Sequence, residues 1–182
     1  KVCVKPDAAM IRAGLSPCCS RCEPGNMRGN VVDRYVALMG RDRFAELMAV
    51  DAGAVPLDEA ALLISTELQP GLDMIEWLAA LDMLAAECPT PTAFGVARYL
   101  FDDEHFVGNR TAYYDWRNSC LDRVIATRTG IPISLSVLMI EVARRVGVRL
   151  VGVGMPTHFL VGVAGDQEVF FDPFGGGRTL DR

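Results

Sequence analysis

The chain has 182 residues, of which 51% are apolar, and it carries a formal net charge of −5. This composition predicts one hydrophobic core, and the negative charge disfavours nonspecific binding to nucleic acid. No apolar run approaches the ~20 residues of a membrane-spanning helix, and the N-terminus lacks an apolar block of the signal-peptide type. We therefore expect a cytoplasmic protein with no membrane or nucleic-acid partner.

The first 30 residues differ in composition from the rest of the chain. They are rich in Gly, Pro, Cys and Arg and have no hydrophobic periodicity, which predicts an irregular N-terminal arm. Cys19 and Cys22 form a C-x-x-C motif there, but no second motif or nearby His completes a zinc site, and no strand precedes it as in redox motifs. We assign the arm no metal or cofactor.

Amphipathic helices are predicted over residues 31–106, because apolar residues recur there at three- and four-residue spacing. The first helix is expected to break near Gly40. The second follows Pro56, where Asp58 and Glu59 favour a helix N-terminus.

Two more helices follow in this region. The third has Asp73 as its N-cap, and the fourth starts at Thr90-Pro91, where a capping residue precedes a proline. The residues expected to face inward are Ile75, Leu78, Ala79, Leu81 and Leu84 in the third helix and Phe94, Ala97, Leu100 and Phe101 in the fourth.

A polar and aromatic loop, VGNRTAYYDWRNS, comes next at residues 107–119. Its length indicates a functional surface, and a lid that ties the loop to the core is the alternative. The candidate substrate-binding residues in it are Tyr113, Tyr114, Asp115, Arg117 and Asn118.

A short helix over 120–128, capped by Asn118 or Ser119, leads to the most apolar helix of the chain, IPISLSVLMIEVARRVG. Pro132 suits its first turn, and Ser134 either caps the helix or lies in that turn. Apolar residues on most of its sides predict a buried helix.

Three strands are predicted after this helix, in VRLVGVG, HFLVGV and EVFFDPF, and the short spacing of the last two predicts a hairpin. Helices followed by an antiparallel sheet predict an α+β fold. We expect a single domain over 31–182, with a helical part at 31–106 and the core at 107–182.

His158 lies at the start of one of these strands, and Asp172 is the acid in the apolar part of the next. With a hairpin loop at 164–166, His158 opposes Asp172 directly. With a loop at 164–167, Phe159 opposes Asp172 and the histidine faces away. A carboxylate beside an imidazole fixes its tautomer and stabilises its charged form, which supports a general base.

A nucleophile would be favoured at the N-terminus of the buried helix, where the helix dipole and free N–H groups stabilise an oxyanion or a thiolate. Ser134 is the side chain at that place, and a helix-capping hydroxyl is its other interpretation. Cys120 is the remaining thiol that could approach the site, and helix packing is its alternative role.

The segments TGIPISLSVL, PTHFLV and FDPF occur in this order, and with them the chain resembles the transglutaminase-like superfamily, specifically its bacterial SirB-type branch. The likeness is strongest over 108–177 and extends weakly back to residue 43. It implies a papain-like α+β core in which Cys, His and Asp perform acyl transfer. His158 and Asp172 fall on the family histidine and aspartate, and the cysteine position falls at or next to Ser134, where this chain has no Cys.

Two functions follow from these observations. A non-catalytic domain would bind a peptide or protein partner in a groove around His158 and Asp172. Alternatively, Ser134, His158 and Asp172 would form the triad of an amide or ester hydrolase or acyltransferase. A site that uses Cys120 is a third hypothesis. The Gly175–Gly177 run lacks the context of a phosphate loop, and no metal-ligand spacing occurs.

Overall fold

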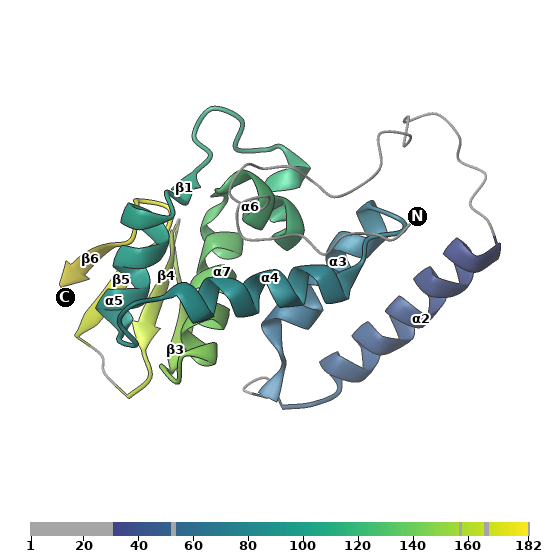
Figure 1. Ribbon diagram of the computed structural model, residues 1–182, viewed down its shortest axis with the longest axis horizontal. Helices are drawn as coiled ribbons and strands as arrows, with labels where there is room; N and C mark the ends of the chain where they lie inside the picture. The colour runs from purple at the N-terminus through teal and green to yellow at the C-terminus, as the bar shows by residue number, and fades with distance from the viewer. Residues whose placement is uncertain (1–30, 52–53, 157, 166–167, 182) are drawn as a thin grey trace.

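The computed structural model describes residues 31–51, 54–156, 158–165 and 168–181. Helices occupy most of the molecule, and an antiparallel sheet lies at one side of it (Figure 1). The predicted N-terminal arm and its C-x-x-C motif lie outside the described residues.

Helix α2 (Val31–Met48) continues through Gly40, so the predicted break there is wrong. A glycine inside a helix costs only about 1 kcal/mol relative to alanine, and a Cβ at this position would lie 3.7 Å from Leu63 Cδ2 of the next helix. Helix α3 (Leu57–Leu68) follows Pro56 and has Asp58 in its first turn, as predicted.

Asp73 caps helix α4 (Met74–Glu87) as predicted, with its carboxylate accepting the N–H groups of Ile75 and Glu76. The predicted cap of the next helix is wrong by two residues. Thr92, and not Thr90, caps α5 (Ala93–Arg98), because Thr92 Oγ1 accepts the N–H of Gly95. A π-helical segment, η2 (Tyr99–Asp103), completes this region.

The inward faces of α4 and α5 differ in part from the prediction. Ile75 is 79% exposed and Phe94 is 59% exposed, although the Phe94 ring packs edge-on against Phe171 at 5.3 Å. Both residues belong to the first turn of their helix. The buried residues of the two helices are Ala80, Leu81, Leu84 and Ala85 in α4 and Ala93, Val96 and Ala97 in α5.

The segment before the central helix contains elements that the sequence did not indicate. Strand β1 (Val107–Gly108) pairs in parallel with β2 (Thr129–Gly130). Between them lie the 3-10 helix η3 (Trp116–Ser119) and α6 (Leu121–Thr127). The N-cap of α6 is Cys120, so the predicted cap at Asn118 or Ser119 is wrong; η3 already includes both of those residues.

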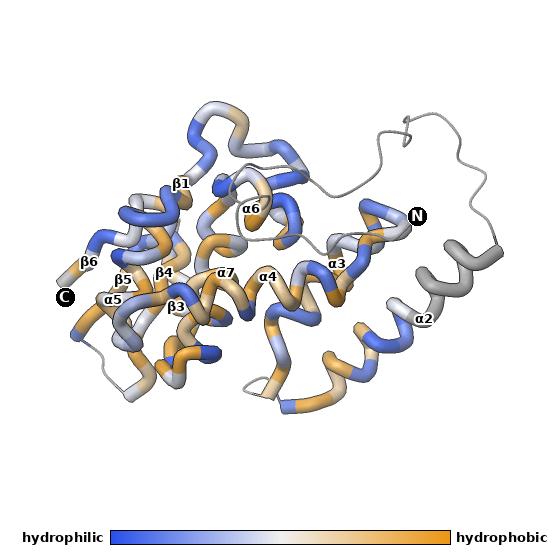
Figure 2. The backbone as a smooth tube through the Cα atoms, in the orientation of Figure 1, coloured by the Kyte–Doolittle hydropathy of each residue, from blue (hydrophilic) through white to orange (hydrophobic). Residues whose placement is uncertain are grey.

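Helix α7 (Pro132–Arg145) begins with proline and is buried on most sides, as predicted. It contacts α4 on one side and β3 and β4 on another. Figure 2 shows apolar residues along α4, α7 and the neighbouring strands, where these elements meet. The fully buried residues of α7 include Leu135, Leu138, Met139, Val142 and Ala143.

The main sheet has the order β3 (Leu150–Met155), β4 (His158–Val163), β5 (Val169–Asp172) and β6 (Arg178–Asp181), with every neighbouring pair antiparallel. The α+β class is therefore confirmed, and the sequence did not predict β6. Within the described residues, no helix combines the length and apolarity needed to cross a membrane.

Both predicted registers of the β4–β5 hairpin are wrong. Val161 pairs with Phe171 and Gly162 with Phe170, so five residues, 164–168, connect the strands. The connection is longer than predicted because Ala164 still belongs to the β3 ladder, where its N–H donates to the Arg149 carbonyl at 3.0 Å.

A buried ion network joins three helices at the C-terminal end of α7. The Arg145 guanidinium binds Asp58 of α3 at 2.6 Å, Asp82 of α4 at 2.7 Å and Glu141 of its own helix at 2.9 Å. Asp58 and Glu141 are almost completely buried. Arg144 also binds both buried carboxylates, so neither lies unpaired in the core.

Replacing Arg145 with methionine should destabilise the protein by about 3–5 kcal/mol, because it leaves two buried carboxylates with the more exposed Arg144 as their remaining guanidinium partner. Urea unfolding followed by circular dichroism measures this change. The matched control is Arg41→Met, which removes an exposed pair with Glu67 and should cost less than about 1 kcal/mol. Equal losses in the two variants would contradict the structural role of the network.

The Asp58 carboxyl makes this network sensitive to acid. Burial tends to raise its pKa, but hydrogen bonds from Arg145 and the Glu59 N–H, with the charges of Arg145 and Arg144, hold the pKa below its usual value. The folded state therefore binds this proton less readily than the unfolded state, and the stabilisation is complete above the unfolded pKa of about 4. It is lost as the pH falls through the lower folded pKa.

Thermal unfolding of wild type and Asp58→Asn across a pH series tests this expectation. The wild type should be the more stable at pH 7, and the difference should shrink as the pH falls below about 4. A difference that is independent of pH would show that the Asp58 charge does not contribute to stability.

Candidate functional site

Ser134 is buried in the first turn of α7, and its hydroxyl is fully used by backbone groups. Its Oγ has two carbonyl acceptors within hydrogen-bond distance, those of Asn118 at 2.6 Å and Ile131 at 3.2 Å, and it accepts the N–H of Ile131 at 3.1 Å. Ile131 is the N-cap of the helix, and Ser134, three residues later, satisfies its backbone N–H; the Ile131 side chain has no acceptor with which to complete a capping box. A hydroxyl has one proton to donate, and the shorter of its two contacts, to Asn118, joins α7 to the preceding 3-10 helix.

Asn118 holds the loop that lies over this helix end. Its side-chain nitrogen donates to the carbonyls of Ala112 at 2.7 Å and Tyr113 at 3.2 Å, and its side-chain oxygen accepts from Asn109 at 3.0 Å. The side chain is buried, and its backbone carbonyl is the acceptor for Ser134. Asn118 therefore has the geometry of a residue that connects the loop to the core.

The other candidate residues of this loop lie at the surface. Tyr114 is 96% exposed, and the neighbouring Tyr113 ring packs edge-on between Tyr114 at 5.3 Å and Phe174 at 5.8 Å. Asp115 caps η3 through the Arg117 N–H and pairs with the Arg117 guanidinium at 3.0 Å.

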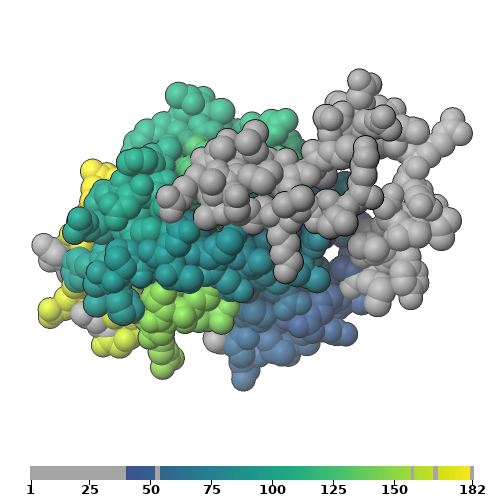
Figure 3. All heavy atoms as spheres, in the orientation of Figure 1, coloured from purple at the N-terminus to yellow at the C-terminus, as the bar shows by residue number. Residues whose placement is uncertain are grey.

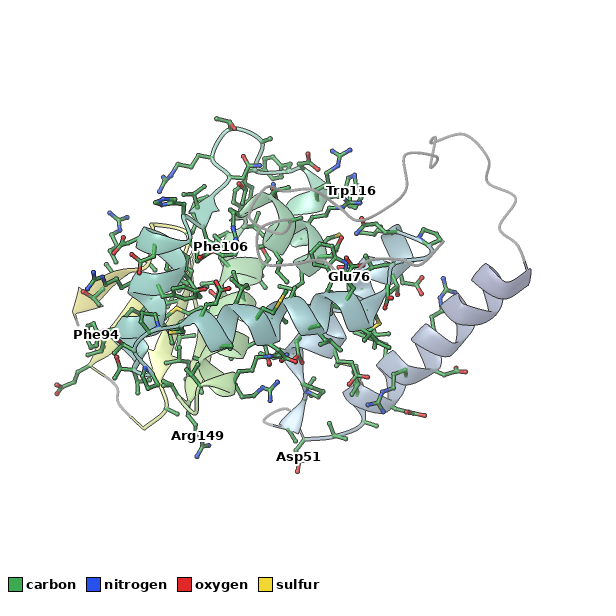
Figure 4. The ribbon with its side chains drawn as sticks, viewed as in Figure 1. Asp51, Glu76, Phe94, Phe106, Trp116 and Arg149 are labelled. Atoms are coloured by element: carbon green, nitrogen blue, oxygen red, sulfur yellow. The ribbon has the colours of Figure 1, made fainter. Side chains whose placement is uncertain are left out.

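Trp116 follows these residues and projects from η3, with the Arg117 guanidinium 5.2 Å from its ring centre (Figure 4). We call residues 109–119 the aromatic loop. Its surface offers three accessible rings beside arginine side chains, while its base is tied to the core by Asn118.

The topology brings Ser134, His158 and Asp172 to the same end of α7. Strand β3 starts after a short connection, 146–149, and runs back along the helix, since a Cβ at Gly152 would lie 3.9 Å from Ile140. The end of β3 and the start of β4 therefore lie towards the N-terminus of α7. Strand β5 is antiparallel to β4, so its last residue lies at this end too.

The alternation of the strands places His158 and Asp172 on the face of the sheet away from α7. The ladder from β3 to β4 is regular up to the pair Met155–His158, and Val161 and Phe171 belong to the core against α7. Neighbouring residues of a strand point to opposite faces. Since Asp172 follows Phe171, and His158 is an odd number of residues from Val161, both point to the outer face.

Asp172 is engaged in its own turn. Its Oδ1 accepts the Gly175 N–H at 2.9 Å, and its Oδ2 lies 3.5 Å from the Arg178 guanidinium. His158 is exposed, and no hydrogen bond joins it to Ser134 or Asp172 in the described part of the chain. The structure therefore brings the three residues to one end of the fold without connecting them.

Cys120 has the environment of a structural thiol. It is completely buried, and its Sγ donates to the Trp116 carbonyl at 3.7 Å. Burial, together with the negative charge of Asp122, raises the pKa of this thiol above its usual value. The nucleophilic thiolate is therefore disfavoured.

Three residues that contribute to this region were missed in the sequence. Asn109 pairs with Asn118, Phe174 covers Gly108 and the Tyr113 ring, and Arg178 binds Asp172. Asn109 could have been found from the sequence, because a second Asn in a loop that contains Gly and Ser often makes the hydrogen bonds that order the loop. Among the described side chains, no group of three or more His, Cys, Asp or Glu residues gathers as metal ligands would.

A profile of the transglutaminase-like superfamily matches residues 67–182. The chain belongs to this superfamily. The match includes the whole of α7, the main sheet and the aromatic loop, so every candidate residue described above lies inside the transglutaminase-like part of the chain.

Curated proteins similar to this transglutaminase-like chain occur in bacteria and animals. A UPF0162 protein of Xylella fastidiosa (strain Temecula1) is 42% identical over 146 residues, which cover 74% of this chain and 52% of the relative. A UPF0162 protein of Vibrio cholerae is 29% identical over 138 residues, 69% of this chain and 51% of the relative. Human F-box only protein 21 is 39% identical over 90 residues, 44% of this chain and 14% of the relative.

The chain spans about half the length of the UPF0162 relatives that it matches. The designation UPF0162 specifies no activity. No solved structure matches the chain significantly.

The Asn118 network predicts that the aromatic loop of this transglutaminase-like domain loses its order when one side chain is removed. Asn118→Ala removes three side-chain hydrogen bonds, and we expect a loss of about 1–3 kcal/mol with faster hydrogen exchange across 109–119. Mass-spectrometric hydrogen exchange measures both. Thr111→Ala is the control within the loop, since Thr111 is exposed and makes one side-chain bond. Unchanged protection in Asn118→Ala would contradict the role of this residue.

Proposed function

We propose that this transglutaminase-like domain is a non-catalytic module that binds a peptide or protein partner. The surface extends from the aromatic loop to the end of the sheet that carries His158 and Asp172. We further propose that the protein is cytoplasmic, that it belongs to the SirB-type branch and that its core is papain-like.

The state of Ser134 carries this proposal. A serine nucleophile must give its proton to a base, but the acceptors around Ser134 Oγ are the backbone carbonyls of Asn118 and Ile131, and the same oxygen accepts the Ile131 N–H. Releasing the hydroxyl would leave the buried Asn118 carbonyl without this donor, which costs about 1–3 kcal/mol. A capping role explains all of these contacts, and the buried thiol of Cys120 offers no substitute.

The aromatic loop supports the binding role. Exposed aromatic rings beside arginine are the residues most often responsible for affinity in protein interfaces. Tyr113 and Trp116 are accessible and are held in place, the first by Phe174 and the second by its position in η3. Because Asn118 ties the loop to α7, these rings lose little freedom when a partner binds.

Panning a phage-displayed library of random peptides on the whole chain tests the proposal. Peptides that bind should lose about tenfold or more in affinity with Tyr114→Ser or Trp116→Ser, because these changes remove an exposed ring from the surface. Ile75→Ser is the matched control, since it removes an exposed apolar side chain from α4. If every selected peptide binds the loop variants as well as the wild type, the proposed surface is wrong.

The alternative function is a hydrolase or acyltransferase that uses Ser134, His158 and Asp172. The observation in its favour is that the topology gathers these residues at one end of α7. A fluorophosphonate probe labels activated serines, and we expect no labelling of the wild type. Labelling that disappears in both Ser134→Ala and His158→Ala would overturn the non-catalytic proposal.

A further inference from the structure

Strand β3 forms one edge of the main sheet, and half of its backbone groups face away from β4. The Ala164 N–H donates to the Arg149 carbonyl, so the backbone groups of Arg149 face β4, and those of every second residue after it do the same. In an antiparallel ladder, residues with inward and outward groups alternate. The N–H and C=O groups of Leu150, Gly152 and Gly154 therefore point to the free edge, and none of them has a hydrogen-bond partner among the described residues.

Arg149 and Pro156 flank this edge, but within its six residues the strand lacks the features that usually protect an exposed edge. Natural sheets shield their edges with charged side chains, prolines or bulges, because an open edge accepts another strand. The sequence of β3 is LVGVGM, its ladder is regular, and Val151 and Met155 are half exposed. The strand offers an accessible row of hydrogen-bonding groups with aliphatic side chains beside it.

Gly154 has no role inside the chain that accounts for a glycine. A Cβ at this position would meet no atom within 4 Å, and its φ is not in the left-handed region. Its backbone groups point to the free edge. A glycine in a strand often marks the close approach of another backbone, and that explanation fits this position.

A groove of about 590 Å³ runs beside the first half of β3. Its lining comes from three places: residues 149–152 at the strand, the C-terminal half of α7, and Val55 and Leu57 before and at the start of α3. In the space-filling view, the light-green atoms around residue 150 lie beside the blue atoms before α3 at the lower rim of the molecule (Figure 3). A groove with this lining admits one extended chain more readily than the edge of a second sheet.

The positive charge at the groove favours an acidic residue in the extended chain that binds there. Arg149 is exposed, has no ion-pair partner in the described part of the chain, and projects from the lower edge of the ribbon (Figure 4). Arg144 lies at the same rim with its side chain 57% exposed. The acids of the groove region, Glu141 and Asp58, are already paired with arginines.

We propose that β3 is a docking edge that takes an extended peptide of a partner protein as a fifth strand of the sheet. The peptide has aliphatic side chains at alternate positions and a carboxylate that lies near Arg149. The groove is at the C-terminal end of α7, whereas the aromatic loop is at the N-terminal end. The last residues of β3 pair with the start of β4 beside His158, so the two proposals are distinguished by the aromatic loop and Arg149. The inference therefore goes beyond the proposed function and stands without it.

The decisive variant is Gly154→Pro, which removes an outward N–H and leaves the β3–β4 ladder intact, since proline is tolerated on an edge strand with its nitrogen facing out. Gly154→Ala is the matched control, because it adds a Cβ and keeps the N–H. Peptides selected by panning on the whole chain should include a class with alternating aliphatic residues and an acid. These should bind Gly154→Pro about tenfold more weakly and Gly154→Ala normally.

A second variant keeps the test valid if Gly154→Pro does not fold. Arg149→Glu reverses the exposed charge. We expect the acidic peptides to bind this variant with about tenfold lower affinity, and the peptides that depend on Tyr114 to bind it with unchanged affinity. Peptides that lose affinity only for Tyr114→Ser bind the aromatic loop. The two proposals can therefore fail independently of each other.

Two results would overturn the proposal. The first is a set of selected peptides that bind wild type, Gly154→Pro and Arg149→Glu equally well. The second is a wild-type dimer in analytical ultracentrifugation that Gly154→Pro converts to monomer, which would assign the edge to a second copy of the chain.

Discussion

The pairing of Arg145 with Asp58 and Glu141 is the interaction on which the arrangement of the helices depends. Carboxylates buried as deeply as these are strongly destabilising without a positive partner, so α3 and α7 must meet where the guanidinium reaches both of them. The bond to Asp82 adds α4 to the same point. The apolar core supplies most of the stabilisation, but this network excludes alternative packings of the three helices.

The N-terminal end of α7 is held by hydrogen bonds of Ser134 and Asn118, and these bonds explain why we assign the site a binding role. Ser134 bonds to Asn118, and Asn118 in turn holds the aromatic loop. One hydroxyl cannot donate to a carbonyl and act as a nucleophile at the same moment. The contact that orders the loop is therefore the contact that opposes catalysis, which is why we favour binding over acyl transfer.

The two proposed surfaces flank α7 and would bind a partner through different groups. The aromatic loop presents side chains, and affinity there would come from burying rings. The edge of β3 presents backbone groups, and affinity there would come from a ladder of hydrogen bonds, with Arg149 adding selectivity. Both are attached to α7, so neither needs to become ordered before a partner binds.

Much of the local structure was predictable because it depends on neighbouring residues. The hydrophobic periodicity predicted the buried helix α7, Asp73 was recognised as a cap, and Pro132 was placed in the first turn. The resemblance to the transglutaminase-like superfamily was carried by short segments in a fixed order. The triad of Ser134, His158 and Asp172 came from the same segments and stays a prediction.

Other features depend on contacts between distant segments, and local patterns do not contain them. Helix α2 passes through Gly40 where it lies against α3, and the exposure of Phe94 reflects where α5 lies on the core. The hairpin register was missed because Ala164 extends its ladder with β3 before the turn begins. The sequence by itself determined most of the helices, three strands of the main sheet, the α+β class and the superfamily. The tertiary structure decided which faces are buried and which partner takes the Ser134 proton, because both depend on atoms that only folding brings together.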